Sequence, residues 1–304
     1  MSGIITTGSH PKALWPGVFS MFGMTYNQHK EEWRDLVDFQ TSDKNYEEMV
    51  QNNGFGLAAV KEQGASVGYD ATSQGGTARA THIVYALGYI VTQEEIEDNL
   101  YEKLSMGRSK ALKISMVETK ENVVANILNR GFSNTFPGGA DATELFSTAH
   151  ATTSGNQSNT LATAADFSEA SLEDMIIQIM GATNDRGLKI KLMPQTLHVP
   201  RQLSMEAIRV LKSTLQNDSA NNAINALREM NALPGGVKVN HYFTDPDAWF
   251  VKTNVTDGLT LFQRRALNFA KDNDFGTGNA LAKADERYSV QWGDFRDYYG
   301  SQGA

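Results

Sequence analysis

A polar stretch near the middle of the chain carries the residue types of a serine hydrolase. In ELFSTAHATTSGNQSNTL (144–161), Ser147 and His150 lie three positions apart, with acidic residues just upstream. A serine nucleophile needs a base within hydrogen-bond reach and a rigid turn that supplies oxyanion donors. The Gly-x-Ser-x-Gly turn that serves many hydrolases is missing around Ser147. We therefore interpret the stretch as a polar loop in which Ser, Thr and Asn bond to the backbone, and a hydrolase that uses Ser147 and His150 is the alternative.

No residue pattern in the sequence supports a metal site or a phosphate-binding loop. The chain has no cysteine, and its six histidines are dispersed without an H-x-x-x-H pair. Asp272, Asp274 and Gly276 follow the order of a calcium loop, but the D-x-D-x-D-G core and the Glu at the twelfth position are missing. The Gly-rich runs FGTGNA and PGGADATE lack the G-K-[ST] ending of a phosphate loop. We expect no cofactor and no metal.

Composition limits the classes of protein that remain. The 304 residues allow one large domain or two modest ones, and 40% hydrophobic with 20% charged residues can form a core. The formal net charge of −8 repels phosphate backbones on average, which disfavours a dedicated nucleic-acid binder. No run approaches the roughly 20 apolar residues of a membrane helix, and the start lacks the pattern of a signal peptide, so we expect no membrane.

Two segments before residue 92 suggest extended parts rather than a core. Residues 1–30 are rich in Gly, Ser, Thr and Pro with apolar residues at no period, which predicts an arm that lies on another surface. From His29 to Met49 the pattern is helical. Residues 55–91 predict a long hairpin: 83–91 alternates with period 2, the run 55–70 is its weaker partner, and 69–79 forms a Gly-rich tip.

A long helix should follow this hairpin. Thr92 and Glu95 form a capping box, and apolar residues recur at helical spacing as far as Ile127. Gly131 is the expected left-handed cap. After a loop to residue 166, helices and strands alternate, including helices near 168–181, 204–216 and 221–233 and strands near 189–200, 237–243 and 248–254. The last segment, from residue 259, predicts an antiparallel pair.

This order of parts resembles the major capsid proteins of tailed phages, which have the Hong Kong 97-type fold. Its local sequence is similar to that of the Mu-type major head subunit group. The similar phrases are LFSTAH (145–150), TLHVPRQLSMEAIRVL (196–211), DPDAWFVKTN (245–254) and ERYSVQWGDFRDYYGS (286–301). The resemblance implies an α+β fold with five parts: an N-terminal arm and leading helix (1–54), an E-loop hairpin (55–91), a P-domain spine helix and loop (92–166), an A-domain (167–245) and return strands completing the P-domain (246–304).

The resemblance also implies a structural function without catalysis. Hexamers and pentamers would form an icosahedral shell around double-stranded DNA, assembled in the bacterial host cytoplasm and located in the virion. Because the hairpin starts by residue 55, no room remains for a scaffolding extension, which implies a separate scaffolding protein or a processed N-terminus. A portal protein and a decoration protein are further implied partners. The expected inter-subunit contacts are Tyr69, Asp70, Thr72, Gln74, Arg79, Trp15 and Phe19.

Other interpretations remain open at this point. A related encapsulin-like compartment shell would have the same fold, and a tail-tube or adaptor protein is a weaker alternative. Basic residues in two groups should pair with acidic residues of adjacent subunits, or contact DNA: Arg264 and Arg265, and Lys103, Arg108, Lys110 and Lys113. Aromatic residues near the C-terminus suggest a half-buried strand pair, with a sugar-binding platform as the alternative: Tyr288, Trp292, Phe295, Tyr298 and Tyr299.

Overall fold

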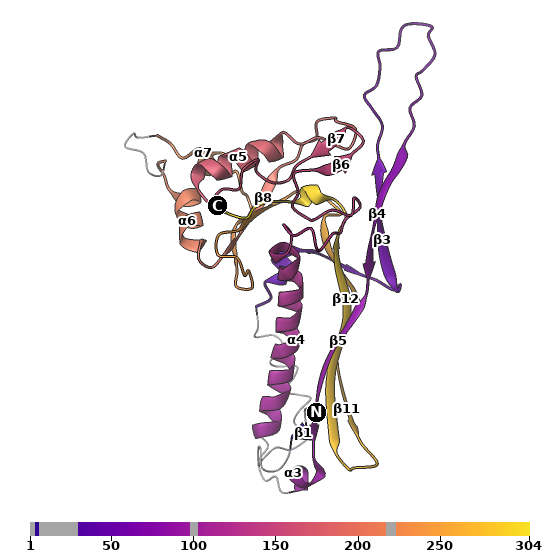
Figure 1. Ribbon diagram of the computed structural model, residues 1–304, viewed down its shortest axis with the longest axis vertical. Helices are drawn as coiled ribbons and strands as arrows, with labels where there is room; N and C mark the ends of the chain where they lie inside the picture. The colour runs from indigo at the N-terminus through magenta and orange to yellow at the C-terminus, as the bar shows by residue number, and fades with distance from the viewer. Residues whose placement is uncertain (1–3, 6–29, 98–102, 217–222) are drawn as a thin grey trace.

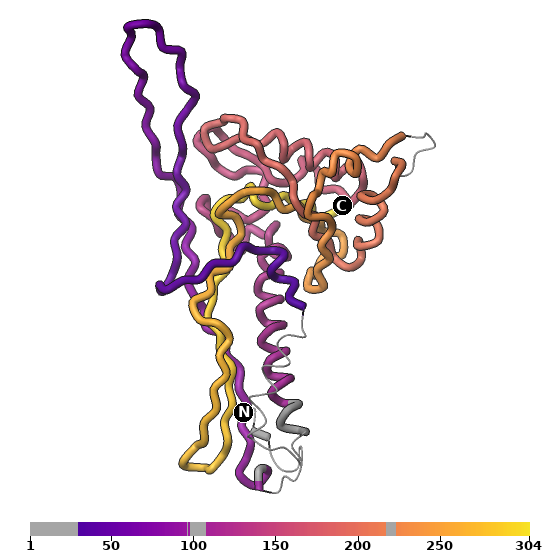
Figure 2. The backbone as a smooth tube through the Cα atoms, turned by 180° about the vertical axis from the view of Figure 1, so that it is seen from behind, coloured from indigo at the N-terminus to yellow at the C-terminus, as the bar shows by residue number. Residues whose placement is uncertain are grey.

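The molecule is long and narrow, with a smaller body attached near one end (Figure 1). The computed structural model describes residues 4–5, 30–97, 103–216 and 223–304. A long sheet and a long helix run side by side and form a shaft, as both views show (Figures 1 and 2). A second sheet with its own helices forms the side body, and a hairpin projects beyond the shaft at the same end. This mixture of helices and strands agrees with the predicted α+β class.

Five strands form the sheet of the shaft, in the order β1-β5-β12-β11-β2. Their bounds are β1 Ile4–Ile5, β2 Asp38–Thr41, β5 Ile83–Val91, β11 Leu259–Asn273 and β12 Ala280–Trp292. β12 is antiparallel to both of its neighbours, β5 and β11. The predicted antiparallel pair at the end of the chain is therefore confirmed, although its second strand begins earlier than expected. The two short strands at the edges pair in parallel, β1 with β5 and β2 with β11.

Two helices occupy the region where the sequence predicts one. Their bounds are α3 Gln93–Glu97 and α4 Lys103–Asn129. Residues 98–102 between them lie outside the described residues, so the predicted continuity is not tested there. Thr92 caps the start as predicted, because its hydroxyl accepts a hydrogen bond from the Glu95 backbone N–H at 3.4 Å. The Glu95 side chain does not complete the capping box but forms an ion pair with Arg108.

Helix α4 is attached to the sheet by apolar packing and by a buried ion pair. Leu112 and Met116 from the helix pack against Ala284 of β12 and the tyrosines of β5. One turn further along, the Lys120 ammonium pairs with the Glu286 carboxylate, and both side chains are buried. Removing either partner would leave an uncompensated charge between helix and sheet, so this pair fixes the register of α4 on β12.

The side body is built on a four-stranded sheet in the order β13-β10-β8-β9. Its strands are β8 Pro194–Pro200, β9 Gly236–Asn240, β10 Trp249–Thr253 and β13 Tyr298–Ser301. Its helices are α5 Glu169–Met180, α6 Ser204–Lys212 and α7 Ala226–Glu229. Ser168 and Ser171 form a reciprocal capping box at the start of α5. The helix expected over 221–233 is shorter than predicted, since only one turn forms there.

The end of the chain is divided between the two sheets. The sequence assigns residues 246–304 to strands that complete the P-domain, but β10 and β13 belong to the side body and only β11 and β12 belong to the shaft. The correction has a simple cause: β10 and β13 pair with each other across Val251 and Tyr299, and β10 also pairs with β8. After β10 the chain therefore passes from the side body into the shaft, and after β12 it returns to the side body.

The helix predicted from His29 to Met49 is also wrong, because among the described residues 30–49 only Trp33–Leu36 (α2) is helical, and 46–49 belong to a strand. A buried carboxylate on α4 sets where α2 starts: Glu121 accepts hydrogen bonds from the backbone N–H groups of Glu32 and Trp33, each at 2.8 Å. At its other end, the Tyr298 hydroxyl donates to the Leu36 carbonyl at 2.6 Å. These tertiary contacts hold one helical turn between the shaft and the side body.

The projecting hairpin is formed by other strands than those predicted. Its strands are β3 (Tyr46–Asn53) and β4 (Ser73–Thr81), joined by the loop 54–72. The expected pairing of 55–70 with 83–91 does not occur, because 83–91 is β5 and bonds to β12 in the shaft. The pair Gly75–Gly76, expected at the tip, lies inside β4. Both strands of the real hairpin are largely solvated, so they carry little of the apolar alternation that sequence patterns detect.

Gly131 follows α4 because of space and not because of backbone conformation. Its φ is not positive, so the predicted left-handed cap is wrong. A Cβ at this position would lie 2.5 Å from the ring of Phe146, and the Gly131 carbonyl accepts a hydrogen bond from the Phe146 N–H at 2.8 Å. The glycine thus lets the chain after the helix press against an aromatic core residue.

We expect Gly131→Ala to destabilise the protein by about 1–3 kcal/mol, because the new methyl group overlaps a ring in a packed core. Urea unfolding followed by circular dichroism measures this loss. The matched control is Gly54→Ala, where a Cβ meets nothing within 4 Å, and it should change stability by less than about 0.5 kcal/mol. Equal stability of the two variants would contradict the proposed close contact.

Asp297 is a buried acid behind the first strand of the long antiparallel pair. Its Oδ2 accepts a hydrogen bond from the Leu259 backbone N–H at 2.8 Å, and its Oδ1 has no hydrogen-bond partner in the described part of the chain. Burial raises the pKa of Asp297 to about 7, although the nearby Lys252 ammonium acts to lower it. Folding therefore takes up a proton at this carboxyl.

We expect Asp297→Asn to stabilise the protein relative to wild type at pH 8 but not at pH 4. The wild-type contribution is complete below the unfolded pKa near 4 and is lost as pH rises to about 7, whereas an amide does not titrate. The difference in unfolding free energy should grow by roughly 2–4 kcal/mol across this range. Urea titrations at both pH values test it, with the exposed Asp174→Asn as control. A difference that is constant with pH would refute the assignment.

Candidate functional site

Ser147 and His150 are close in sequence, but the structure gives them separate partners. His150 Nδ1 lies 2.6 Å from a carboxylate oxygen of Asp141, and its Nε2 lies 3.1 Å from the side-chain oxygen of Asn159. The Ser147 hydroxyl instead accepts a weak hydrogen bond, at 3.4 Å, from a backbone N–H two residues on. Because both ring nitrogens are occupied by other residues, His150 is not placed to take a proton from Ser147.

The His150 ring and the Asn159 amide hold the loop against the C-terminal strands. The ring is fully buried and stacks on Phe295 with 3.9 Å between centroids. The Asn159 amide donates to the carbonyls of Leu145, Phe295 and Tyr298, at 2.7, 3.2 and 3.0 Å. These hydrogen bonds hold three separate backbone segments together. The geometry supports the structural interpretation of the polar stretch over the hydrolase.

The residues considered for metal binding have other partners. In the described ranges, no group of three or more His, Asp and Glu side chains is arranged to hold a metal ion. Asp274 shapes the turn between β11 and β12: its oxygens accept from the Gly276 N–H at 3.1 Å and from the Thr277 hydroxyl at 2.7 Å. These hydrogen bonds lower the pKa of Asp274.

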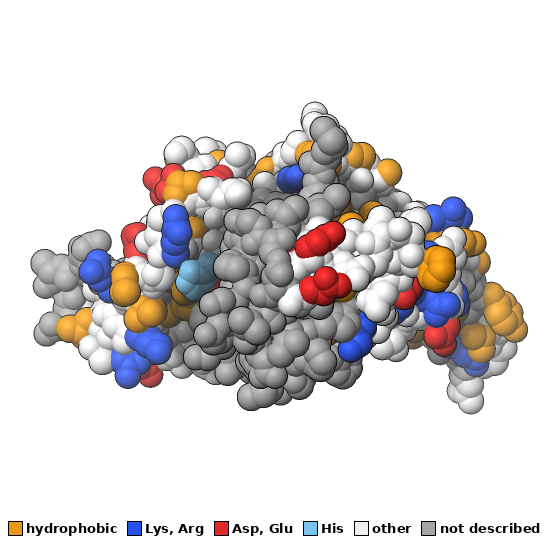
Figure 3. Space-filling view, turned by 90° about the horizontal axis from the view of Figure 1, so that it is seen from below, with side chains coloured by type: hydrophobic (Ala, Val, Ile, Leu, Met, Phe, Trp, Pro, Cys, Tyr) orange, Lys and Arg blue, Asp and Glu red, His pale blue; other side chains and the backbone are white. Residues whose placement is uncertain are grey.

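Several basic residues expected to contact adjacent subunits have partners within the chain. Arg108 pairs with Glu95, Arg264 with Asp43, and Arg265 with Asp285. Their contact with adjacent subunits stays a prediction. Seen along the shaft, described acidic and basic side chains are mixed rather than gathered into a basic patch (Figure 3). The C-terminal aromatic residues are all buried, which contradicts a sugar-binding platform: Tyr288, Trp292, Phe295, Tyr298 and Tyr299.

The loop 54–72 at the end of the hairpin exposes apolar side chains far from the core (Figure 1). Five of them are more than half exposed: Phe55 62%, Leu57 84%, Val60 96%, Val67 59% and Tyr69 97%. Scattered apolar residues are common on surfaces, but a concentration of them in one projecting loop is typical of an interaction site. We therefore take this loop as the candidate functional site.

The base of the loop is fastened to a turn of the side body at residues 184–187. The Arg186 guanidinium bonds to both carboxylate oxygens of Asp70, at 2.7 and 3.2 Å, and to the Gly54 carbonyl at 2.9 Å. Asp70 also accepts from the Gly56 and Ala71 N–H groups. The hydrogen bond from Arg186, with help from these backbone N–H groups, lowers the pKa of Asp70 to about 2. The two ends of the loop thus meet on one guanidinium.

A second contact joins strand β3 of the hairpin to the same turn of the side body. The Gln51 amide of β3 donates to Asp185 at 2.6 Å, and the other Asp185 oxygen pairs with the buried Arg296 at 2.7 Å. Arg296 is also held by Asp294, by the Gln157 side chain and by a backbone carbonyl. On the opposite strand, β4 passes so close to Ala140 that a Cβ on Gly76 would lie 1.7 Å from that carbonyl oxygen. The hairpin is therefore attached along both strands.

The predicted contact residues are distributed between the loop and its base. Tyr69 is exposed, Asp70 is bound to Arg186, and Thr72 is exposed. Gln74 is exposed in β4, whereas Arg79 pairs across the hairpin with Glu48. Trp15 and Phe19 lie outside the described residues. Of the candidates in the hairpin, Tyr69 is thus the one large apolar side chain that is free to meet another molecule.

Sequence reasoning missed most of the loop and its attachment. Phe55, Leu57, Val60 and Val67 were expected within a strand, and their lack of strict alternation was the available signal against that. No local signal identifies Arg186 as the partner of Asp70, because 116 positions separate them. Such a pair is created by folding alone.

A family described as "Phage capsid protein" has a sequence model that matches residues 76–300. No curated protein matches the chain. Among solved structures, the capsid of a native GTA particle aligns with a TM-score of 0.60 at 12% identity, covering 90% of each chain. A structure from Mycobacterium phage Patience gives 0.58 at 10% identity, covering 100% of this chain and 93% of the other.

A virus-like particle from Pyrococcus furiosus is also similar, with a TM-score of 0.55 at 8% identity over 94% of this chain and 98% of that one. At such identities these likenesses show the fold, and the fold is that of Hong Kong 97-type capsids. They do not distinguish the Mu-type group. In the described part of the chain, no helix is long and apolar enough to cross a membrane.

We expect His150→Ala to destabilise the protein by about 2–4 kcal/mol, because it removes a buried ring that bonds to the partly buried Asp141 and to the buried Asn159. Ser147→Ala should cost less than about 1 kcal/mol, since its hydroxyl makes one weak contact. Urea unfolding of both variants measures the contrast. Labelling of wild-type Ser147 by a fluorophosphonate probe would contradict this structural role.

Proposed function

This chain belongs to the phage capsid protein family and is a structural capsid subunit, and from that premise we propose how it assembles. Copies of it form hexamers and pentamers that tile an icosahedral shell around double-stranded DNA. The observation that carries this proposal is the loop 54–72, which presents five exposed apolar side chains at the end of a projecting hairpin. A neighbouring subunit is the surface on which this loop would be buried.

The free energy gained by burying apolar side chains favours a contact of this kind. Full burial of a large apolar side chain contributes about 1.5–3 kcal/mol, so a few such residues can stabilise an interface between subunits. In a closed shell each subunit both offers and receives a hairpin, which repeats the gain at every interface. The attachment of the loop to Arg186 and of β3 to Asp185 reduces the entropy lost on docking, because the hairpin is already directed before a neighbour arrives.

The remaining partners follow from this role. The net charge of −8 and the mixed surface charges suit a container that encloses DNA without sequence-specific binding. A separate scaffolding protein, a portal protein and a decoration protein are proposed partners, and the virion is the proposed location after assembly in the host cytoplasm. Membership of the Mu-type group rests on the phrases in the sequence. We assign no catalytic activity.

An encapsulin-like shell is the second candidate, because a virus-like particle from an archaeon shares the fold. The match of the phage capsid family to residues 76–300 favours the phage head. The two candidates differ in their contents, DNA or an enzyme. Nucleic-acid staining of particles purified from the natural source separates them.

The β3–β4 ladder shows where the hairpin can be shortened to test this function. Asn53 and Ser73 lie opposite each other in the last pair of the β3–β4 ladder, so a two-residue Asn-Gly turn can replace 54–72. We expect this variant to unfold within about 1 kcal/mol of wild type, because the loop adds little to the core. It should fail to form shells, as measured by sedimentation velocity and electron microscopy.

A second variant serves as control: a Gly/Ser segment of nineteen residues, the length of the loop 54–72, keeps its reach but removes its apolar side chains. If apolar contact drives assembly, both variants should fail. Normal shells from either variant would show that the apolar loop is not the contact, and a variant that cannot fold would place the loop in the core.

A further inference from the structure

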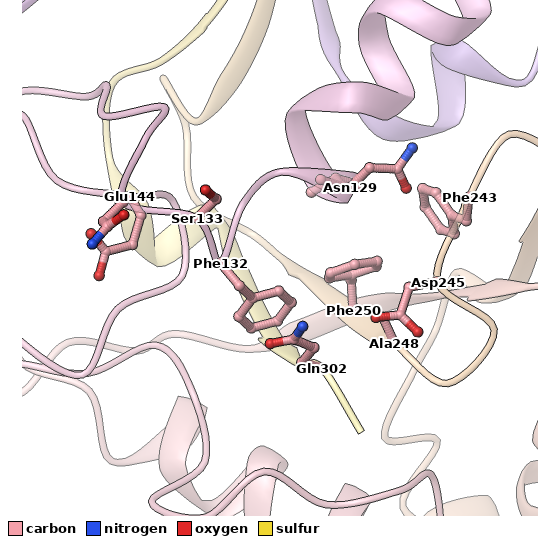
Figure 4. A pocket seen from close by; sticks show the side chains of 11 residues that line it. Asn129, Phe132, Ser133, Glu144, Phe243, Asp245, Ala248, Phe250 and Gln302 are labelled. Atoms are coloured by element: carbon pink, nitrogen blue, oxygen red, sulfur yellow. The ribbon is translucent and has the colours of Figure 1, made fainter. Parts of the chain in front are cut away.

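A groove with an aromatic floor lies where the shaft meets the side body (Figure 4). Two hollows of about 470 and 310 Å³ adjoin here, and both are lined by Phe132, Glu144 and Gln302. The first hollow continues past the end of α4 towards Asp245. The second continues over the polar stretch that contains Ser147. The groove thus crosses the junction between residues that follow α4 and the C-terminal end of the chain.

Stacked phenylalanine rings form its floor. Phe132 and Phe146 are 4.7 Å apart between centroids with 28° between their planes, and Phe146 lies 5.2 Å from Phe250. Phe146 and Phe250 are buried, whereas Phe132 is only partly covered and lines both hollows. In Figure 4, Phe132, Phe250 and Gln302 lie between Glu144 on one side and Asp245 on the other. The partly covered Phe132 ring is therefore the accessible part of the aromatic floor.

The charges around this floor have one sign. None of the described residues that line the two hollows is Lys or Arg, while Glu144 and Asp245 are both partly exposed at the rim. In the described part of the chain, Glu144 takes part in no hydrogen bond or ion pair, and Asp245 only accepts from the backbone N–H of Asp247 at 3.1 Å. Most other carboxylates near the junction are already paired, as Asp35, Asp38 and Asp185 show.

We propose that this groove binds a segment of a second protein that presents an arginine or lysine side chain. The cation would lie over the Phe132 ring and between the carboxylates of Glu144 and Asp245, while aliphatic neighbours in the segment cover the rest of the aromatic floor. Arginine fits best, because its planar guanidinium stacks on a ring and bonds to a carboxylate at the same time.

Charge selects the kind of partner. A phosphate or another anion is repelled by the unpaired carboxylates at the rim. Another copy of this chain has a net charge of −8, so it matches the carboxylates of this groove less well than a basic protein does. A basic accessory protein is attracted both by the whole subunit and by the groove. The proposal concerns the unassembled subunit and does not depend on shell formation.

The test uses the full chain at a concentration where it is unassembled, and a fluorescein-labelled peptide of sequence Gly-Ser-Leu-Arg-Gly-Leu-Arg-Ser-Gly. Fluorescence anisotropy should show binding that is lost when both arginines of the peptide are replaced by citrulline, which has the same shape without the charge. The double variant Glu144→Gln, Asp245→Asn should bind roughly tenfold more weakly, as expected for the loss of two charge contacts. Phe132→Leu should weaken binding about threefold, because it removes the ring face.

The matched control is Glu173→Gln, Asp174→Asn on α5, which changes the net charge equally but lies outside the groove. It should bind within about twofold of wild type, and thermal unfolding confirms that each variant is folded. Equal loss in the control and groove variants would reduce the effect to general charge attraction and overturn the proposal. Equal binding of the citrulline and arginine peptides would also overturn the proposal. A groove variant that binds the peptide normally but no longer self-associates would overturn it too, because the occupant of the groove would then be a second copy of this chain.

Discussion

Strand β12 is hydrogen-bonded on both sides for most of its length, and the other parts of the molecule depend on that. Its pairing with β5 and β11 makes a narrow sheet long enough to support α4, which is fixed to it by the buried Lys120–Glu286 pair. β5 continues back into the hairpin strand β4, and the end of β12 leads into the side body through β13. A break in this strand would therefore separate all three parts at once.

Buried polar contacts join the parts to each other in addition to an apolar cluster that the shaft and the side body share, with Val124 and Leu259 from one and Phe250 from the other. Glu121 accepts hydrogen bonds from the start of α2, and Asn159 joins three backbone segments. Arg296 pairs with Asp185, which in turn bonds to Gln51 of the hairpin. Each of these groups is buried and has several partners, which makes the geometry specific because any other arrangement would leave a polar group unsatisfied. The hairpin can thus be directed by its own subunit while its loop stays open to a neighbour.

The surfaces left for other molecules differ in chemistry. The loop 54–72 exposes five large apolar side chains and is attached to the side body at its base, which suits repeated contacts between identical subunits. The groove around Phe132 is aromatic with a carboxylate rim, which suits a cationic partner. Because the two sites lie in different parts of the fold, assembly and the binding of an accessory protein can be affected separately by substitution.

The sequence by itself determined the elements whose patterns arise from burial. The pair at 259–292 and helix α5 place apolar residues against a core, so their periods are visible. The alternation in 83–91 also indicated a strand, although Ile83, Val84 and Leu87 in it are exposed. The order of parts indicated the capsid fold. Only the tertiary structure decided the partners. It paired 83–91 with β12, formed the solvated hairpin β3–β4, and joined Asp70 to Arg186 across 116 positions. Solvated strands need no apolar period and distant ion pairs leave no local pattern, so neither could be found before the chain was folded.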